Sequence, residues 1–557
     1  MEALKPNPVI RLLPSLTDLA FLMPAAFVFL RMNGAPGMLG DGDTGWHVRT
    51  GEWILANGRV PSQDIFSYTK AGEPWFAWEW LWDVSFAWMY RHGGMAAVVL
   101  ASLLVISATS VLLFRLVRRR CGNALIAIGV MFLVTGGCAI HYLARPHLFT
   151  FLFIVIFYSI LERVREGEIR LLWWLPALTV LWTNIHGAFF VGIFLAGAYA
   201  AGELISAVTN ADSRQRLEAA RRSKPYLMAA GGCLLASFIN PYTYHLHRHI
   251  VEYLTDKYQY QSIGEFQSFN FHHPVTMFFE PMLLAAFGAA VWSLIKRQYV
   301  YAILILGWAH LALTVVRNEP IFMLLAGLPV AVFLESMVSS VVGANVAGIL
   351  RRTALHFRNF SADFTATDSI SRAHVTSFAA LALLTALFYA PHPPANCRAE
   401  YDARHYPAKA VEMLQKASAP ETIFTDDEWG DYLIYRLYPG KKVFIDGRSD
   451  FYGPKFNQKY LDVMNVRYDW ESNLNRYHVD TILLPPNSPL AATLKESRHW
   501  HPIYDDGVAI VFRAGALGGR NQVSVVSSDG KYRDHRIAKP QPGDRTITIS
   551  NLRSEPS

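Results

Sequence analysis

The stretch Asp41-Gly42-Asp43-Thr44-Gly45-Trp46-His47 follows directly after an apolar run of membrane-spanning length at 12–30. Polar residues placed in this way, at the end of an apolar run, recur at 141–147, 184–187, 240–249 and 317–320. A polar or charged group held at that depth in a bilayer is costly, and where one occurs it generally serves function. The sequence therefore predicts an active site embedded in a membrane.

The composition is that of a polytopic membrane protein. The chain has 557 residues, of which 52% are hydrophobic and only 17% charged, whereas soluble domains carry about 25% charged residues. About eleven apolar runs, with flanking residues, reach the length needed to cross a hydrocarbon core. They are 12–30, 95–117, 124–140, 148–161, 171–182, 188–205, 226–239, 275–295, 299–316, 321–334 and 375–390. No small-residue cleavage site follows the first run, so we take it as a retained span.

Basic residues predict the orientation of these spans. One side of the predicted topology collects Arg118-Arg119-Arg120, Lys296-Arg297 and the basic segments 162–170, 214–224 and 351–372. Lys and Arg are retained in the cytoplasm, so we expect a cytoplasmic N-terminus and export of everything after about residue 390. These loops account for the net charge of +7, and we therefore expect no nucleic-acid partner.

Three segments are expected along the chain. Residues 1–391 should form the transmembrane domain, 392–514 an exported α/β domain, and 515–557 a disordered tail. The first outer loop, 31–82, is rich in tryptophan, which favours helices lying at the membrane interface. The basic stretch 343–374 is expected to be a mobile loop.

Local patterns predict elements within the first outer loop and the exported part. Asp43 as N-cap and Gly58 as stop predict one interfacial helix. In the exported part, β-branched and aromatic residues predict strands at 422–425, 442–445, 481–484 and 508–512, with helices at 407–417 and 456–466.

Two acids follow the first span. Asp41 and Asp43 lie where a carboxylate is partly desolvated and is therefore a better general base. The alternative is that Asp43 only caps a helix and Asp41 only makes a turn. His47, one turn after Asp43, would orient this base or contact a phosphate, unless it merely packs at the interface. Glu79, four residues before Asp83, would position an acceptor or hold a metal, the alternative being an acid that faces water.

Proline marks three further outer turns as possible helix starts. They are Arg145-Pro146, Asn240-Pro241 and Arg317-Asn318-Glu319-Pro320. A helix beginning there aims its positive end at the outer leaflet, where phosphate would bind. Arg145 and Arg317 would add a bidentate clamp on a lipid phosphate or pyrophosphate. The alternative is that both arginines snorkel to ordinary headgroups.

Histidines complete the list of candidates. His147, close after Arg145, and His186, at a helix break, are candidate contacts to phosphate or acceptor, with a satisfied core histidine as the alternative. His245, His247 and His249 alternate in what reads as a loop, and no cysteine or acid has ligand spacing, so we predict no zinc site there. We expect no fixed cofactor, and a divalent metal ion is the one alternative.

An acidic pair in the first outer loop, interfacial helices, a core of about eleven spans and a terminal exported domain together resemble the GT-C superfamily of integral-membrane glycosyltransferases. Protein O-mannosyltransferases and aminoarabinose transferases belong to this superfamily. The chain looks most like bacterial members, mostly without assigned substrates, through the stretches 41–47 and Lys442-Val443-Phe444-Ile445-Asp446-Gly447-Arg448. The similarity extends to about residue 515.

This resemblance implies a polyprenyl-phosphate-linked sugar donor, a glycan, lipid or protein acceptor activated by a first-loop aspartate, and inversion at the anomeric carbon. By position the base would be Asp43 or Asp41, and we favour Asp43. Better-known members have a lone Asp or an adjacent Asp-Glu in place of Asp-Gly-Asp, so both residues stay candidates. The implied location is the bacterial inner membrane, with the C-terminal domain in the periplasm or outside the cell.

Three other functions remain open from the sequence. A ligase or polymerase that moves a whole lipid-linked glycan would depend on basic residues more than on Asp43. A flippase or transporter for lipid-linked sugars would place its charges near the midplane and pair broken helices between two halves. A scaffold displaying the exported domain would not require polar clusters on so many spans.

Overall fold

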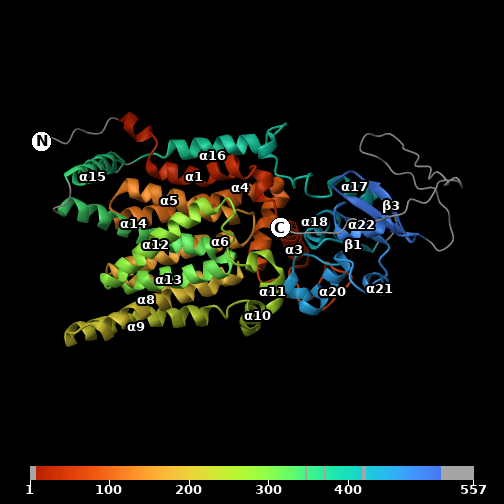
Figure 1. The fold of residues 1–557 in the computed structure, drawn as a ribbon, viewed down its shortest axis with the longest axis horizontal. Helices are drawn as coiled ribbons and strands as arrows, with labels where there is room; N and C mark the ends of the chain where they lie inside the picture. The colour runs from red at the N-terminus through yellow and green to blue at the C-terminus, as the bar shows by residue number, and fades with distance from the viewer. Residues whose placement is uncertain (1–7, 345–347, 369, 371, 417–421, 516–557) are drawn as a thin grey trace, which may run out of the picture.

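The structure is a computed structural model that describes residues 8–344, 348–368, 370, 372–416 and 422–515. The predicted tail 515–557 lies outside the described residues apart from its first residue. Figure 1 shows a bundle of long helices lying side by side, with a smaller sheet-containing part at one end of the bundle.

Eleven helices build the bundle, and each overlaps one predicted apolar run. They are α1 (Leu16–Arg31), α4 (Trp80–Cys121), α5 (Ala124–Cys138), α6 (His147–Arg165), α7 (Trp174–Thr183), α8 (Phe190–Thr209), α9 (Ser213–Ala236), α12 (Thr276–Ile295), α13 (Tyr299–Thr314), α14 (Glu319–Gly343) and α16 (Val375–Phe388). Seven segments of the described chain are long and apolar enough to cross a membrane, and three shorter apolar helices accompany them. The protein is thus a polytopic α-helical membrane protein.

Close packing in the bundle depends on small residues, as is usual between membrane helices. Residues 319–331 of α14 are buried without interruption. A Cβ atom added at Gly137 of α5 would lie 2.8 Å from a carboxylate oxygen of Glu319, so the missing side chain lets α5 and α14 approach.

Further helices and 3-10 turns connect or flank the bundle helices. The helices are α2 (Ala35–Met38), α3 (Asp43–Asn57), α10 (Tyr244–Thr255), α11 (Lys257–Ser262) and α15 (Gly348–Asp368), and the 3-10 turns are η1 (Pro8–Leu12), η2 (Ala139–His141), η3 (Ile169–Trp173), η4 (Gly187–Phe189), η5 (Gly264–Phe266), η6 (Val316–Asn318) and η7 (Ala395–Cys397). The prediction of a mobile loop at 343–374 was wrong, because most of this stretch is α15. Asp368 at its end accepts a hydrogen bond from the Leu16 backbone and pairs with Arg118.

The helix predicted in the first outer loop is present as α3, and Gly58 ends it in the left-handed conformation, as expected. The predicted N-cap was wrong by one residue. Gly42 occupies the cap position, and Asp43 is the first helical residue. The carboxylate of Asp41 serves the helix start, because it accepts a hydrogen bond from the Asp43 backbone N–H at 2.9 Å.

The sheet has four strands in the order β1-β2-β4-β3. They are β1 (Ile423–Thr425), β2 (Thr481–Leu484), β3 (Trp500–Asp505) and β4 (Ile510–Ala514), with α17 (Ala408–Lys416), α18 (Asp427–Leu437), α19 (Ser449–Tyr452), α20 (Pro454–Met464), α21 (Trp470–Arg476) and α22 (Pro489–Lys495) around them. β1 and β2 run parallel, and the other pairs are antiparallel. Three of the predicted strands overlap β1, β2 and β4, whereas β3 was not predicted.

The predicted strand at 442–445 is replaced by single bridges that join the sheet to the first outer loop. Val443 bridges to Ile423 of β1 and to Ser67 of the loop. The backbone N–H of Tyr68 donates to the Val443 carbonyl at 3.0 Å, and the Thr69 hydroxyl donates to the Phe444 carbonyl at 2.6 Å. These bonds hold the first outer loop against the C-terminal part of the chain, and the candidate site lies where the two meet.

Candidate active site

A polar cavity of about 530 Å³ lies between α3, the start of α4 and the C-terminal part of the chain. Nine acids and three arginines line it: Asp41, Asp43, Glu79, Asp83, Glu265, Asp427, Glu428, Asp431, Asp450, Arg145, Arg317 and Arg448. Residues from the first outer loop, from three later turns and from the C-terminal part thus converge on one space.

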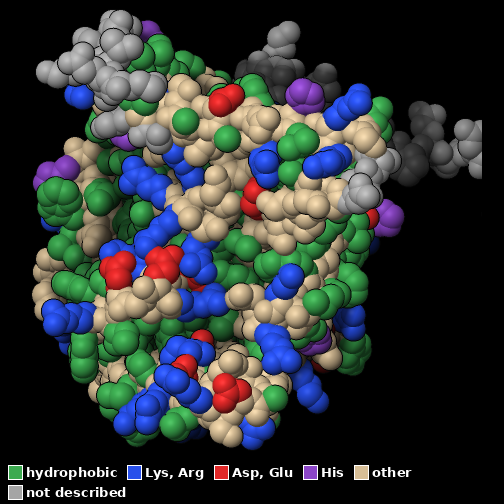
Figure 2. All heavy atoms as spheres, turned by 90° about the vertical axis from the view of Figure 1, so that its left-hand side faces the viewer, with side chains coloured by type: hydrophobic (Ala, Val, Ile, Leu, Met, Phe, Trp, Pro, Cys, Tyr) green, Lys and Arg blue, Asp and Glu red, His purple; other side chains and the backbone are tan. Residues whose placement is uncertain are grey.

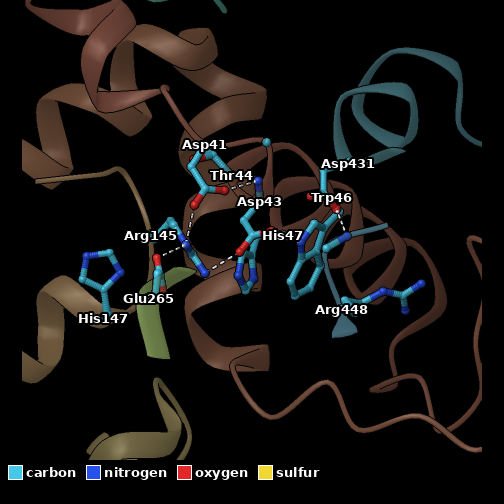
Figure 3. Close-up of polar contacts among 12 residues, drawn as sticks. Asp41, Asp43, Thr44, Trp46, His47, Arg145, His147, Glu265, Asp431 and Arg448 are labelled. Atoms are coloured by element: carbon cyan, nitrogen blue, oxygen red, sulfur yellow. Dashed lines mark hydrogen bonds and ion pairs between the residues drawn. The ribbon is translucent and has the colours of Figure 1, made fainter. Parts of the chain in front are cut away.

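Arg145 holds the two predicted bases together. Figure 3 shows Asp41 and Asp43 pointing at its guanidinium from α3 and the turn before it. Arg145 Nη1 lies 2.5 Å from Asp41 Oδ2, and Arg145 Nη2 forms an ion pair with Asp43 Oδ2. The Trp46 indole N–H donates to the other oxygen of Asp43 at 3.1 Å. One guanidinium is therefore shared between both candidate bases.

Electrostatics distinguish Asp41 within this group. Burial raises the pKa of Asp41 and the neighbouring Asp43 adds to the rise, while Arg145 opposes it, so that the pKa reaches about 6. Burial disfavours the charge on Arg145, but the surrounding carboxylates outweigh it and raise the pKa of Arg145. The guanidinium is therefore charged at any physiological pH.

Glu265 links Arg145 to Arg317. Its carboxylate lies 3.9 Å from Arg145 and 3.4 Å from Arg317, and Arg317 also donates to the Tyr253 hydroxyl at 3.1 Å. Burial opposes ionisation of Glu265, but Arg317, His141 and Arg145 together lower its pKa to about 2. The two arginines are thus held near each other by a carboxylate that stays ionised.

Glu79 lies between two imidazoles. Its oxygens are each 3.5 Å from a ring nitrogen, one of His47 and one of His186. The other ring nitrogen of His47 contacts Asp83 at 2.7 Å, and that of His186 contacts the Thr150 hydroxyl at 2.8 Å. Burial raises the pKa of Glu79 to about 8 against the opposing charges of Arg145 and Arg317, and burial lowers that of His186 to about 3. The Glu79 carboxyl is therefore neutral near pH 7.

An apolar cavity of about 470 Å³ extends from the same residues into the bundle. Its walls are mainly aromatic and aliphatic, and include Phe151, Phe190, Phe194, Trp308, Leu311 and Ile321. Six residues line both cavities: Trp78, Glu79, Arg145, Tyr253, Glu265 and Arg317. A polar space and an apolar space therefore meet at the two arginines.

Some buried polar atoms at this junction make no hydrogen bond with the described residues. They are Arg145 Nε and both ring nitrogens of His141. Buried polar atoms are normally hydrogen-bonded, and exceptions often mark functional sites. The junction is therefore suited to accept further hydrogen-bonding groups.

The C-terminal part contributes residues from the stretches 426–432 and 443–448, for which the sequence leaves acceptor contact and domain packing as alternatives. The Gly447 N–H donates to Asp431 at 2.9 Å. A Cβ atom at Gly447 would lie 2.8 Å from Asp43 Oδ1, so only glycine allows this approach. Arg448, 4% exposed, is bound by Asp446 and Asp64 and stacks over Trp75. The stretch 442–448 is one of the two that resemble GT-C members, and the sequence could therefore point to it. No sequence pattern marks the segments that contain Glu265 and Tyr253.

The structure brings most of the predicted site residues together. Asp41, Asp43, His47, Glu79, Arg145 and Arg317 line the polar cavity, and His147 and His186 line the apolar cavity. Asn240 and Glu319 line neither. The Asn240 amide makes hydrogen bonds within its own turn, to Ser237 and Tyr242, and Glu319 is buried at the start of α14 against Gly137.

The remaining histidines lie elsewhere than predicted. His245, His247 and His249 are on α10 and not in a loop, and His249 pairs with Asp450 at 3.0 Å. Within the described ranges, no group of three or more His, Cys, Asp or Glu residues has the geometry to hold a metal ion.

Comparisons with known proteins identify the fold. No protein-family model and no curated protein matches the chain. The apo crystal structure of the Archaeoglobus fulgidus oligosaccharyltransferase aligns with a TM-score of 0.53 at 11% identity, covering 84% of this chain and 69% of that chain. The same enzyme tethered with an acceptor peptide containing the NVT sequon aligns with a TM-score of 0.53 at 11% identity, covering 90% and 74%. ArnT from Cupriavidus metallidurans in the apo state aligns with a TM-score of 0.49 at 13% identity, covering 91% and 99%. The chain has a GT-C-like fold.

Proposed function

We propose that the protein is an inverting glycosyltransferase that moves a sugar from a polyprenyl-phosphate-linked donor to an acceptor at the outer face of the bacterial inner membrane. One observation carries the proposal: the polar and apolar cavities meet at Arg145 and Arg317. A lipid-linked sugar has a matching arrangement, because phosphate joins an apolar prenyl chain to a polar sugar. The GT-C-like fold and the oligosaccharyltransferase neighbours support it.

The donor would bind across the junction. Its prenyl chain would lie along Phe190, Phe194 and Trp308 in the apolar cavity, where burial of apolar area provides binding energy. Its phosphate would lie at Arg145 and Arg317, whose guanidinium groups suit bidentate contact with phosphate oxygens. The sugar would then project into the polar cavity, towards Asp43.

The transfer step requires a base and a stabilised leaving group. Asp43, or Asp41, accepts the proton of the acceptor hydroxyl while that oxygen bonds to the anomeric carbon from the side opposite the phosphate. The bond from this carbon to the phosphate oxygen breaks, so the configuration inverts and the polyprenyl phosphate leaves with its electron pair. Negative charge grows on this phosphate, and Arg145 and Arg317 would stabilise it, an effect typically worth about 2.7–4 kcal/mol per donor.

Arg145 would also couple donor binding to release of the base. Without donor, its guanidinium is bound by Asp41 and Asp43. A donor phosphate competes for the same N–H groups and loosens the ion pair with Asp43, so the carboxylate is freed when a sugar is in place. Because the base is freed only after the donor phosphate binds, the donor would not react before it is correctly positioned.

The polar cavity favours certain acceptors. An acceptor entering it meets nine carboxyl groups and three arginines. Electrostatic complementarity then favours a neutral or positively charged acceptor over an anionic one. A whole lipid-linked glycan remains a possible donor, which would make the protein a ligase. A flippase is less well supported, because the cavity charges lie at one end of the bundle and not at its middle.

Transfer by the purified protein tests the proposal. Full-length protein in detergent is given a polyprenyl-phosphate sugar and candidate acceptors, and released polyprenyl phosphate and glycosylated acceptor are measured by mass spectrometry. Asp43→Asn and Asp41→Asn distinguish base from bystander, and Asp363→Asn, an exposed change on α15 outside both cavities, is the matched control. If both cavity variants fold and transfer at the wild-type rate, the assignment of the base is wrong.

A further inference from the structure

A second pocket lies at the other end of the bundle, where residues near the C-terminal end of α4 line it. It has a volume of about 150 Å³ and is formed by α4 and α6. Four arginines line it, Arg115, Arg119, Arg120 and Arg163. Figure 2 shows this end of the molecule, where many Lys and Arg side chains surround hydrophobic and a few acidic ones.

The charges in the pocket do not cancel. Glu162 and Glu166 also line it, and Glu168 beside it pairs with Arg163, so three carboxylates face four arginines. Both lining acids are already engaged: Glu162 pairs with Arg120 at 2.9 Å, and Glu166 pairs with Arg120 and Arg119. Arg115 is exposed and makes no ion pair or hydrogen bond with any described residue. The pocket therefore offers one free guanidinium, that of Arg115, beside three arginines that carboxylates hold in place.

One face of α4 carries both apolar and basic side chains, which suits a ligand with an apolar and an anionic part. Leu112, Arg115, Leu116 and Arg119 occupy positions i, i+3, i+4 and i+7 of the helix and share one face. The arginines lie nearer than Leu112 to the C-terminal end of the helix, and the headgroups of a bilayer are expected at the ends of membrane-spanning helices. The volume of about 150 Å³ gives room for a phosphate group.

We propose that this pocket binds the phosphate diester of an anionic glycerophospholipid, with an acyl chain along Leu112 and Leu116. Basic pockets between membrane helices are suited to such headgroups, and each Lys or Arg near the surface contributes about 1 kcal/mol. The site is independent of the transfer reaction, because its lining shares no residue with either cavity of the candidate active site.

Native mass spectrometry of the delipidated full-length protein tests the site. The protein is titrated separately with phosphatidylglycerol, phosphatidylcholine and inorganic phosphate, and bound lipid is counted. Arg115→Gln is compared with Arg221→Gln, which removes the same charge from an exposed, unpaired arginine on α9 outside the pocket. We expect Arg115→Gln to weaken phosphatidylglycerol binding about fivefold, the equivalent of about 1 kcal/mol, and Arg221→Gln to leave it unchanged.

Three results would overturn the proposal. Equal weakening by both variants would show only general attraction to a basic surface. Equal binding of phosphatidylcholine and phosphatidylglycerol would show that net lipid charge is not recognised. Displacement of phosphatidylglycerol by inorganic phosphate at a matching concentration would show a site for the free anion.

Discussion

Two buried ionic networks, one at each end of the bundle, use similar residues for different purposes. Glu162 accepts hydrogen bonds from Tyr199 at 2.5 Å and Tyr301 at 2.9 Å, and it pairs with Arg120 and Arg165. Every carboxylate oxygen there has partners from other helices, so the network joins α4, α6, α8 and α13.

The network around Arg145 is incomplete by comparison. Arg145 pairs with three carboxylates, yet its Nε and both ring nitrogens of the nearby His141 make no hydrogen bond with the described residues. Two cavities open beside it. A satisfied buried network rigidifies a fold, whereas an unsatisfied one costs stability unless a ligand completes it. Mutations in the first network should therefore affect stability, and mutations in the second should affect transfer.

The largest expected effect is that of Asp43→Asn on transfer. The amide cannot accept the acceptor proton, and loss of a general base typically lowers kcat by about 10²–10⁴-fold. Asp41→Asn should have a smaller effect, because Asp41 mainly serves the start of α3. The turnover of both variants at saturating donor measures the difference. A larger loss for Asp41→Asn would make Asp41 the base.

Arg145→Gln should have the second-largest effect on the rate of transfer. It removes the guanidinium between the two cavities, and loss of such a charge donor lowers the rate by about 10²–10³-fold. Arg145→Lys should recover only part of this loss, because lysine lacks the bidentate fork. Steady-state transfer with Arg221→Gln as a charge-matched control measures the effect. Wild-type rates in Arg145→Gln would exclude this residue from donor binding.

Glu162→Gln should leave transfer unchanged and reduce stability. Breaking a buried pair by removing one partner costs about 3 kcal/mol, here by leaving Arg165 without its carboxylate. Thermal unfolding in one detergent should show a lower Tm, with unchanged specific activity of the folded fraction. A loss of activity as large as that of Arg145→Gln would remove the distinction between the two networks.

The smallest effect should be a pH dependence at Glu79. Its pKa of about 8 in the folded protein lies above its ordinary value of 4.5, so its contribution to stability is present below pH 4.5 and is lost as the pH rises through 8. Ionisation also places a negative charge beside the donor phosphate. Glu79→Gln should remove both effects. Tm and donor KM of both proteins between pH 6 and about 9 test this, and identical profiles would exclude Glu79 as the titrating group.

Much of the bundle could be predicted from sequence because span length and hydropathy are local properties. All eleven apolar runs overlap helices, although α9 begins with a charged segment before its apolar run. Strands that form only by pairing with segments elsewhere in the chain could not be predicted from local sequence. β3 contains Pro502 and is defined by pairing with β4, and the apolar run 442–445 makes only single bridges because the first outer loop lies beside it.

The same distinction holds for the candidate site. Asp41, Asp43 and Arg145 were identifiable because each follows an apolar run, but their mutual contact is a product of the fold. Glu265 could not be identified, because it reaches the site from a segment far along the chain with no pattern of its own, whereas for Asp431 the sequence left acceptor contact and domain packing as alternatives. The hydropathy pattern of the sequence predicts which residues lie near a membrane surface, but it does not predict which of them contact one another.

A cryo-EM structure of the full-length protein with polyprenyl phosphate tests the central claim most directly. The account predicts a phosphate within hydrogen-bonding distance of Arg145 and Arg317, a prenyl chain in the apolar cavity lined by Phe190 and Phe194, and an Asp43 carboxylate released from Arg145. A phosphate bound elsewhere, with the ion pair between Arg145 and Asp43 intact, would contradict it.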